Sequence, residues 1–268
     1  MVDLGRINIL GSCISALDYE RAVQLTIDSA KDRKPLSIAA LAVHGLILGV
    51  NNRKFRRRLN GISLVLPDGQ PIYWLLRYWK KKNIPSRVYG PEFMSRVIEA
   101  ACRENLSVYF YGSTQPVLSI KTWHFKRLYP KLKIAGFESS KFRRFSKSEQ
   151  LDLAKRIQSS GADMVFVGLG CPRQEYWVYE YSYYIKKPLI AVGAAFNYHA
   201  GLLKKPYGWV QKLGLEWLFR FMQEPKRLAV RYLLYNSEFL LLTLFSLMKL
   251  INIKPLYPLK SEKEELYA

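Results

Sequence analysis

A turn rich in glycine and hydrogen-bonding side chains follows the apolar run 164–167. The turn contains Gly168 and Gly170, and the segment after Pro172 is predicted to be a helix. That helix opens with Arg173, Gln174 and Glu175. A strand-to-helix turn presents backbone N–H groups where partial positive charge collects, and glycine lets an anionic ligand approach closely. Glycine and proline are also common between any strand and helix. The three polar side chains nevertheless favour a phosphate-binding site.

A carboxylate follows another predicted strand. Residues 62–66 form a short apolar run, and Asp68 and Gly69 come directly after it, before an aromatic helix predicted over 72–79. In open parallel sheets, ligands bind at the carboxyl ends of the strands. Asp-Gly pairs also occur in turns that have no other role. At such a strand end, Asp68 is a candidate general base for a substrate hydroxyl.

Two further strand ends carry side chains suited to ligands. His44 follows the apolar run 36–43, which has the length of a buried parallel strand. A final strand, starting at residue 189, leads into a loop that contains Gly193, Phe196 and Asn197. A histidine after a buried strand is most often structural, and loop aromatics often form a packed lid. Both also suit contact with a ligand, including stacking on a sugar or base.

The elements that must position these residues alternate along the chain. Strands are predicted over 7–14, 36–43, 62–66, 107–112, 132–137, 164–169 and from 189. Helices are predicted over 19–29, 72–79, 93–103, 117–129, 148–159 and 175–184, and residues 46–59 are expected to present a solvated basic helix face. This alternation predicts an α/β fold with a mostly parallel sheet and helices on both of its faces.

Composition limits the functional classes. The 268-residue chain carries 42 Lys and Arg against 21 Asp and Glu, a net charge of +21, which favours nucleic acid, an anionic membrane or phosphorylated substrates. The three cysteines suggest neither a disulfide framework nor a zinc site, so a reducing cytosol is expected. The N-terminus lacks the pattern of a signal peptide, and no export is expected. Without G-x-G-x-x-G or a Walker A motif, dinucleotide oxidoreductases and P-loop NTPases are disfavoured.

The composition changes after Gly201. Residues 206–220 and 225–251 are predicted to form amphipathic helices rich in Trp, Tyr, Arg and Lys. The segment 228–251 is strongly apolar, but Arg231, Glu238 and Lys249 interrupt it. It is therefore expected to lie on a membrane or pack on the core rather than to cross a bilayer. An ordinary helix buried on its own domain or at an oligomer interface is the alternative.

Several motifs in combination resemble those of the WecG/TagA/CpsF glycosyltransferase family. They are LPDGQ at 66–70, RVYGP at 87–91, FYGS at 110–113, VGLGCPRQE at 167–175, AVGAAF at 191–196, GLEWLFR at 214–220, QEPKR at 223–227 and RY at 231–232. The resemblance implies metal-independent, inverting transfer of a sugar from a UDP-sugar to a polyprenyl-diphosphate-linked saccharide. It places this reaction at the cytoplasmic face of the bacterial plasma membrane, on a peripheral protein.

The resemblance also implies an architecture and a set of site residues. A Rossmann-like core is expected over residues 1–201 and a helical appendage that completes the active site over 202–268, with no cofactor or metal and with a homo-oligomer possible. Asp68 resembles the catalytic base. The expected substrate contacts are His44, Gly69, Tyr89, Gly90, Gly112, Gly168, Gly170, Arg173, Gln174, Glu175, Gly193, Phe196, Asn197, Arg220 and Arg227. Gln174 and the glycine turn would contact the nucleotide sugar, and the last two arginines would contact the diphosphate.

Two departures from the family pattern leave the sugar open. The family's Thr-x-Asn is Ala40-Leu41-Ala42 here, with His44 as the expected substitute, and its Phe-Asp is Phe196-Asn197. N-acetylmannosamine, another hexose or a uronic acid therefore remain candidates. The alternative function is a basic nucleic-acid-binding protein, favoured by the mixed basic and aromatic runs 121–127 and 141–145, although no recognised binding module is present.

Overall fold

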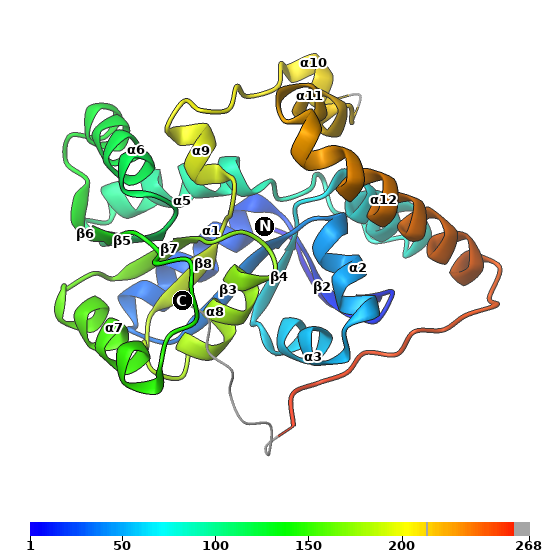
Figure 1. Ribbon diagram of the computed structural model, residues 1–268, viewed down its shortest axis with the longest axis horizontal. Helices are drawn as coiled ribbons and strands as arrows, with labels where there is room; N and C mark the ends of the chain where they lie inside the picture. The colour runs from blue at the N-terminus through cyan, green and yellow to red at the C-terminus, as the bar shows by residue number, and fades with distance from the viewer. Residues whose placement is uncertain (213, 260–268) are drawn as a thin grey trace.

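A six-stranded sheet forms the centre of the molecule, in the order β4-β3-β8-β7-β5-β6 (Figure 1). The computed structural model describes residues 1–212 and 214–259. The strands are β3 (Leu36–Leu41), β4 (Leu64–Pro67), β5 (Ser107–Gly112), β6 (Lys133–Glu138), β7 (Met164–Gly168) and β8 (Pro188–Ala191). Every neighbouring pair is parallel, so all the carboxyl ends lie at one edge. The predicted mostly parallel α/β fold is confirmed.

Helices cover both faces of this sheet (Figure 1). One face packs against α2 (Val43–Asn51), α3 (Arg53–Gly61), α7 (Lys147–Ser159) and α8 (Arg173–Tyr181). The other packs against α1 (Tyr19–Lys31), α5 (Gly90–Arg103), α6 (Gln115–Leu128) and α9 (Ala195–His199). Along β5, Tyr109 and Tyr111 join the first core while Val108 and Phe110 join the second. This alternation follows from the two-residue period of a strand and explains why β5 is apolar throughout.

The N-terminal segment differs from its prediction as a single strand over 7–14. It forms an antiparallel hairpin of β1 (Asp3–Ile9) and β2 (Ser12–Leu17), separate from the main sheet. The chain reverses at Leu10 and Gly11, which have φ angles of 47° and 83°. Glycine adopts this left-handed conformation readily, and Asn8 Oδ1 accepts the Gly11 N–H at 2.8 Å, which stabilises the turn. The hairpin packs beside β4, where Ser15 Oγ accepts the Val65 N–H at 3.0 Å.

The predicted solvated basic face over 46–59 is only partly correct. Asn52 ends α2 and caps α3 by accepting the Phe55 N–H, so two helices occupy this segment. Arg58 is only 2% exposed. Its Nε lies 3.1 Å from Glu180 Oε1 of α8 in a buried ion pair. Burial of a cation in this way requires a charged partner, which no local pattern in α3 could indicate.

The predicted helix over 72–79 begins earlier than expected and changes its geometry. It consists of α4 (Gln70–Trp74), directly after Asp68 and Gly69, and a single π-helical turn, η1 (Leu75–Trp79). Ile72 and Leu76 point into the core and are fully buried. The start of α4 therefore lies against the end of β4.

In the described part of the chain, three helices follow the core. They are α10 (Gly208–Lys212), α11 (Glu216–Gln223) and α12 (Pro225–Leu247). Asn51 Nδ2 of α2 donates to Glu238 Oε2 of α12 at 3.0 Å, which ties α12 to the core. The chain then returns beneath α12 toward β2 and α3 (Figure 1), where Asn60 Nδ2 donates to the Leu256 carbonyl at 2.8 Å. Residues 260–268 of the expected appendage lie outside the described part of the chain.

Candidate active site

The turn after β4 is fixed to the end of β3. The backbone N–H groups of Asp68 and Gly69 both donate to the Leu41 carbonyl at 3.2 Å. Parallel pairing of β3 with β4 brings this carbonyl to the turn. The result is that Asp68 sits at the carboxyl edge of the sheet, as predicted, and the residue as a whole is half-buried.

The segment before α5 holds the Asp68 carboxylate from the other side. Asp68 Oδ1 accepts the Gly90 N–H at 2.6 Å. Arg87 Nη1 donates to the Asp68 backbone carbonyl at 3.1 Å, and the Arg87 guanidinium lies 4.7 Å from the centre of the Tyr89 ring. Asp68, Gly69, Tyr89 and Gly90, which the sequence proposed as site residues, therefore lie together.

The C-terminal helices complete this cluster. Glu216 Oε2, at the start of α11, accepts a hydrogen bond from Arg87 Nη2. Arg220, one turn later, stands 6.0 Å from the centre of the Tyr198 ring, which itself contacts the Tyr89 ring edge-on at 6.2 Å. Arg87, Arg220 and Tyr89 thus lie near the Asp68 carboxylate at the meeting point of the core and α11, and Tyr198 packs against Tyr89 and Arg220.

Burial raises the pKa of the Asp68 carboxyl above its ordinary value, and the positive charges of Arg87 and Arg220 and the Gly90 N–H oppose this rise. A carboxylate with a raised pKa accepts a proton more readily than an ordinary aspartate. Burial also raises the pKa of the Tyr89 phenol well above its usual range, with Tyr198 adding to the effect. Tyr89 therefore remains a neutral hydrogen-bonding group, and the raised pKa of Asp68 suits the role of general base, which stays a prediction.

The predicted phosphate-binding turn lies farther along the same edge, at the end of β7. A Cβ on Gly168 would approach the Phe196 ring to 2.6 Å, and a Cβ on Gly112 of β5 would approach the Gly168 carbonyl to 2.9 Å. Gly112 also has a φ of 99°. Both glycines are therefore needed for packing as well as for any close ligand approach. Phe196 is 1% exposed and lies beneath the turn.

Gln174 connects the turns after β7 and β8. Its Oε1 accepts the Gly170 N–H at 3.1 Å, and its Nε2 donates to Glu175 Oε1 at 3.0 Å. A Cβ on Gly193, whose φ is 53°, would stand 3.0 Å from the same Oε1. The Gln174 side chain is buried at 4% exposure. It fixes the shape of the turn, and its contact with a nucleotide sugar stays a prediction.

His44 and Glu175 face α12. His44 lies in the first turn of α2 rather than in a loop, and its ring contacts Tyr235 edge-on at 4.5 Å. Burial, with the nearby charge of Arg231, lowers the pKa of His44 to about 4. Burial raises the pKa of Glu175 to about 7, and hydrogen bonds from Gln174 and Cys171 limit the rise. These groups are thus covered by α12, and a role for either in substrate binding stays a prediction.

The remaining predicted residues, Asn197, Arg227 and Arg173, lie outside the Asp68 cluster and the glycine turn. A cavity of about 450 Å³ between α9 and α11 is lined by residues 201–204, Asn197, Gln223 and Glu224. Arg220 Nε stands 3.7 Å from Glu224 Oε2, and Arg227 forms an ion pair with the same carboxylate. Arg173 is exposed and lies 5.8 Å from the Phe142 ring.

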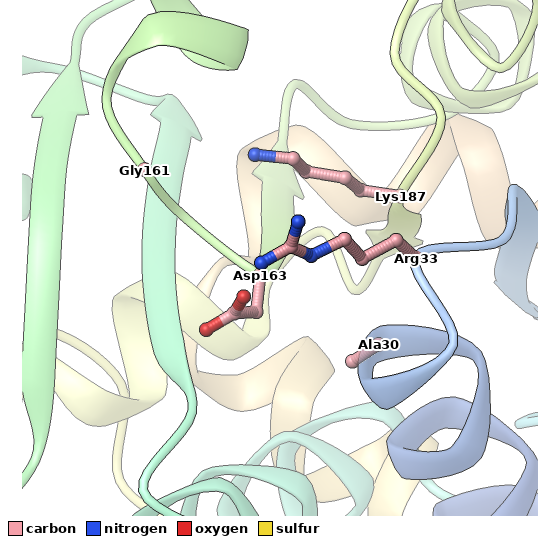
Figure 2. A pocket seen from close by; sticks show the side chains of 5 residues that line it. All are labelled: Ala30, Arg33, Gly161, Asp163 and Lys187. Atoms are coloured by element: carbon pink, nitrogen blue, oxygen red, sulfur yellow. The ribbon is translucent and has the colours of Figure 1, made fainter.

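A second cavity, of about 260 Å³, lies at the opposite edge of the sheet. Figure 2 shows Arg33 and Lys187 extending beside Asp163, with Ala30 and Gly161 completing the lining. Asp163 and Lys187 immediately precede β7 and β8, so this cavity is at the amino ends of the strands. It is separate from the Asp68 cluster and is not the expected location of a ligand in a parallel sheet.

Arg87, Tyr198 and Glu216 belong to the site geometry but were not among the predicted site residues. Arg87 and Glu216 fall within the motifs at 87–91 and 214–220, which was the available signal. Within residues 1–212 and 214–259, no group of three or more His, Cys, Asp or Glu side chains is arranged to hold a metal ion.

Comparison with known proteins gives two consistent findings. The sequence profile described as Glycosyl transferase WecG/TagA/CpsF family matches residues 7–252. Three relatives are each described as an N-acetylglucosaminyldiphosphoundecaprenol N-acetyl-beta-D-mannosaminyltransferase. The Bacillus spizizenii protein is 26% identical over 66% of this chain and 67% of its own length, and the Bacillus subtilis protein is 27% identical over 66% and 68%. A Staphylococcus aureus protein is 25% identical over 64% and 65%.

Proposed function

The chain belongs to the WecG/TagA/CpsF family of glycosyl transferases, and we propose that it transfers a sugar from a UDP-sugar to a saccharide carried on a polyprenyl diphosphate. The observation that carries the proposal is the position of Asp68. Its carboxylate lies at the carboxyl edge of a parallel sheet, is held by the Gly90 N–H, and has a raised pKa beside Arg87 and Arg220. The three relatives named above support the acceptor class, because their names specify a diphosphoundecaprenol-linked N-acetylglucosamine.

In this proposal the reaction is a single displacement. Asp68 removes the proton from an acceptor hydroxyl while that oxygen forms a bond to the anomeric carbon of the donor sugar. The bond from the anomeric carbon to the UDP oxygen breaks, and its electron pair leaves with UDP. One displacement inverts the anomeric configuration, so no covalent enzyme intermediate is required. General base catalysis of this kind contributes about 10²–10⁴-fold to the rate.

The donor phosphates would lie along the turn from Gly168 to Gln174. Three interstrand spacings of about 4.8 Å separate β4 from β7, so this turn stands roughly 14 Å along the edge from the Asp68 strand. An elongated nucleotide sugar extending between them would bring its anomeric carbon toward the carboxylate. We propose that transfer needs no metal ion, with cationic side chains and backbone N–H groups offsetting the charge that develops on UDP.

Residues 202–268 are proposed to form an appendage that supplies the acceptor side of the site. Arg220 and Arg227 share the Glu224 carboxylate in this structure, and an acceptor diphosphate would offer both of them stronger anionic partners. The arrangement supports this role because α11 already places Arg220 close enough to Asp68 to influence its pKa.

The location is proposed to be the cytoplasmic face of the plasma membrane. Within the described chain, α12 is the helix long and apolar enough to span a bilayer, and 17% of its apolar window is buried. Its exposed apolar residues follow a helical spacing and are Val230, Leu233, Leu234, Leu240, Leu241, Leu244, Phe245 and Leu247. The opposite side of α12 packs on α2 through Tyr235 and Glu238. A helix attached to the core on one side and apolar on the other suits a position on the membrane surface.

The donor sugar is proposed to be N-acetylmannosamine, another hexose or a uronic acid. The relatives' names favour the first. The end of β3 carries Ala40 and Ala42, and the family's hydroxyl and amide are missing there. Fewer polar groups at this position would change how the hydroxyls of the sugar are recognised.

The experiment uses the purified full chain with a detergent-solubilised polyprenyl-diphosphate-linked N-acetylglucosamine, a panel of UDP-sugars and EDTA. Extension of the lipid-linked saccharide by one residue, with the anomeric configuration inverted, is the expected result. Transfer that EDTA abolishes and added Mg²⁺ restores would overturn metal independence. No extension from any UDP-sugar, together with thermal stabilisation by duplex DNA but not by UDP, would favour the nucleic-acid alternative.

The burial of one cation counts against that alternative. Lys121, in the first of the two basic and aromatic runs, is fully buried beside Phe110 and Phe196. Arg143, in the second, pairs with Glu149. Lys121 therefore cannot contact a phosphate backbone in this conformation, whereas Arg143 stays exposed at the surface.

A further inference from the structure

A single arginine connects Glu216 of α11 to the Asp68 turn. Arg87 Nη2 donates to Glu216 Oε2, while Arg87 Nη1 donates to the Asp68 backbone carbonyl at 3.1 Å. The Arg87 and Glu216 side chains are 13% and 12% exposed, so the ion pair is largely removed from water. The two residues are 129 positions apart in sequence, and the pair joins the core to the C-terminal helices.

The start of α11 has a second attachment beside the same turn. Gly214 has a φ of 71°, and a Cβ there would stand 3.0 Å from the Trp74 ring and 3.3 Å from Gln70 Cγ. Gln70 and Trp74 are the first and last residues of α4, which begins two residues after Asp68. The chain entering α11 thus packs directly on α4, and this contact brings Glu216 within reach of Arg87.

The two Arg87 hydrogen bonds go to Glu216 and to the Asp68 backbone and not to the Asp68 carboxylate. Arg87 reaches the backbone carbonyl of Asp68, and the carboxylate oxygen Oδ1 is bonded instead to the Gly90 N–H. The positive charge of Arg220 on α11 also lowers the pKa of Asp68. The negative charge of Asp68 in turn raises the pKa of the Tyr19 and Tyr89 phenols. An arginine that turned both nitrogens toward a carboxylate would form a bidentate pair and stabilise its ionised form.

We propose that Glu216 is a positioning residue that keeps Arg87 engaged away from the Asp68 carboxylate, so that docking of α11 leaves that carboxylate free to accept a proton. The inference rests on the proposed function, in which Asp68 is the general base. It adds a reason why a site located on the core would depend on a helix from the C-terminal segment. Without the Glu216 carboxylate, Arg87 would lose its anionic partner, and its positive charge would act on Asp68 alone.

The test compares Glu216→Gln and Glu216→Asp with the wild-type enzyme in the full chain. The pH profile of kcat/KM reports the essential base of the free enzyme. Glu216→Gln removes the negative charge, so the acid limb of the profile is expected to move by about one unit toward lower pH, with a lower plateau because the base is weaker. Glu216→Asp keeps the charge and is expected to keep the acid limb near that of the wild type. Glu104→Gln, which removes a carboxylate from an exposed ion pair with Lys31, is the matched control and should leave the profile unchanged.

A direct titration keeps the inference testable if transfer by Glu216→Gln is too slow to measure. The ¹³C shift of the Asp68 carboxyl, assigned by comparison with Asp68→Asn, should report a lower pKa in Glu216→Gln than in the wild type. A loss of rate with no movement of the acid limb, or equal Asp68 titrations in the two proteins, would show that Glu216 merely holds α11 in place and would overturn the proposal. Near wild-type transfer by Asp68→Asn would instead reject the general-base assignment, whatever the titration shows.

Discussion

Asp68 Oδ1 accepts the backbone N–H of Gly90 at 2.6 Å, which fixes a carboxylate at the end of β4 to the first residue of α5. The bond orients one carboxylate oxygen and leaves the second available for a proton. Because Gly90 begins a helix, the N–H that it donates also carries part of the helix dipole. The position of the proposed base is therefore determined by backbone atoms and should be sensitive to small shifts of this contact.

Replacement of Gly90 by alanine tests that sensitivity. A Cβ at this position would stand 3.3 Å from Ala40 Cβ, 3.4 Å from Asp68 Oδ1 and 3.5 Å from the Val192 carbonyl. These contacts are tight but can be relieved by a small displacement, so we expect the variant to fold. That displacement would move the Asp68 carboxylate, and we therefore expect transfer to fall by about tenfold. Gly208→Ala, whose Cβ meets no atom within 4 Å, is the matched control. Equal kcat values for the two variants would contradict a strict requirement on the Asp68 position.

The buried Glu175 carboxyl gives a prediction for stability against pH. Its pKa is about 7 in the folded protein and 4.5 ordinarily, so between these values the folded chain binds a proton that the unfolded chain does not. The free energy of unfolding therefore falls as pH rises through this window, by up to about 3 kcal/mol at about 1.4 kcal/mol per pKa unit.

The glutamine side chain of Glu175→Gln is neutral at every pH, so this variant does not show the fall in the free energy of unfolding that titration of Glu175 causes. Urea unfolding should show the variant gaining stability relative to the wild type between pH 5 and pH 8. Titration of His44 and His199 occurs in both proteins and cancels in the difference. A stability difference that is the same at both pH values would mean that Glu175 is ionised without penalty in the folded state.

The exposed face of α12 gives a prediction for membrane binding. Leu233 and Leu240 are 72% and 66% exposed and lie two helical turns apart. Aspartate at both positions removes apolar contact and adds charge that anionic lipid repels, so binding to anionic vesicles should weaken by at least about tenfold. Co-sedimentation measures this binding, and Ile120→Asp with Leu128→Asp on α6 is the matched control. Unchanged vesicle binding by the α12 variant would assign its exposed face to another partner.

The spacing of apolar residues along the chain was sufficient to predict the main architecture but not every connection between elements. The alternation of apolar strands with amphipathic helices predicts the parallel sheet, because both faces of each central strand are buried. The same criterion failed at Leu10 and Gly11, because the hairpin turn takes only these two residues and the polar residues beside it, Asn8 and Ser12, are single breaks in a largely apolar segment. It also placed His44 after a strand, whereas the helix begins one residue earlier at Val43.

Some parts of the site follow from the local sequence, and others depend on contacts between segments that are far apart in the chain. The position of Asp68 follows from its place after a short apolar strand. The ion pair between Arg87 and Glu216 depends on how α11 packs against α4, a contact between segments well over one hundred residues apart. Spacing within either motif carries no information about that packing, so the pairing of these two residues could be recognised only in the folded chain.

Asp68→Asn in the lipid-linked acceptor assay is the measurement that tests the central proposal most directly. Asparagine can still accept the Gly90 N–H through its carbonyl oxygen, so the variant should fold and stabilise on UDP binding as the wild type does. It cannot take up the acceptor proton, and transfer should fall by about 10²–10⁴-fold. A folded Asp68→Asn protein that binds UDP normally and transfers sugar at a rate near that of the wild type would contradict the account.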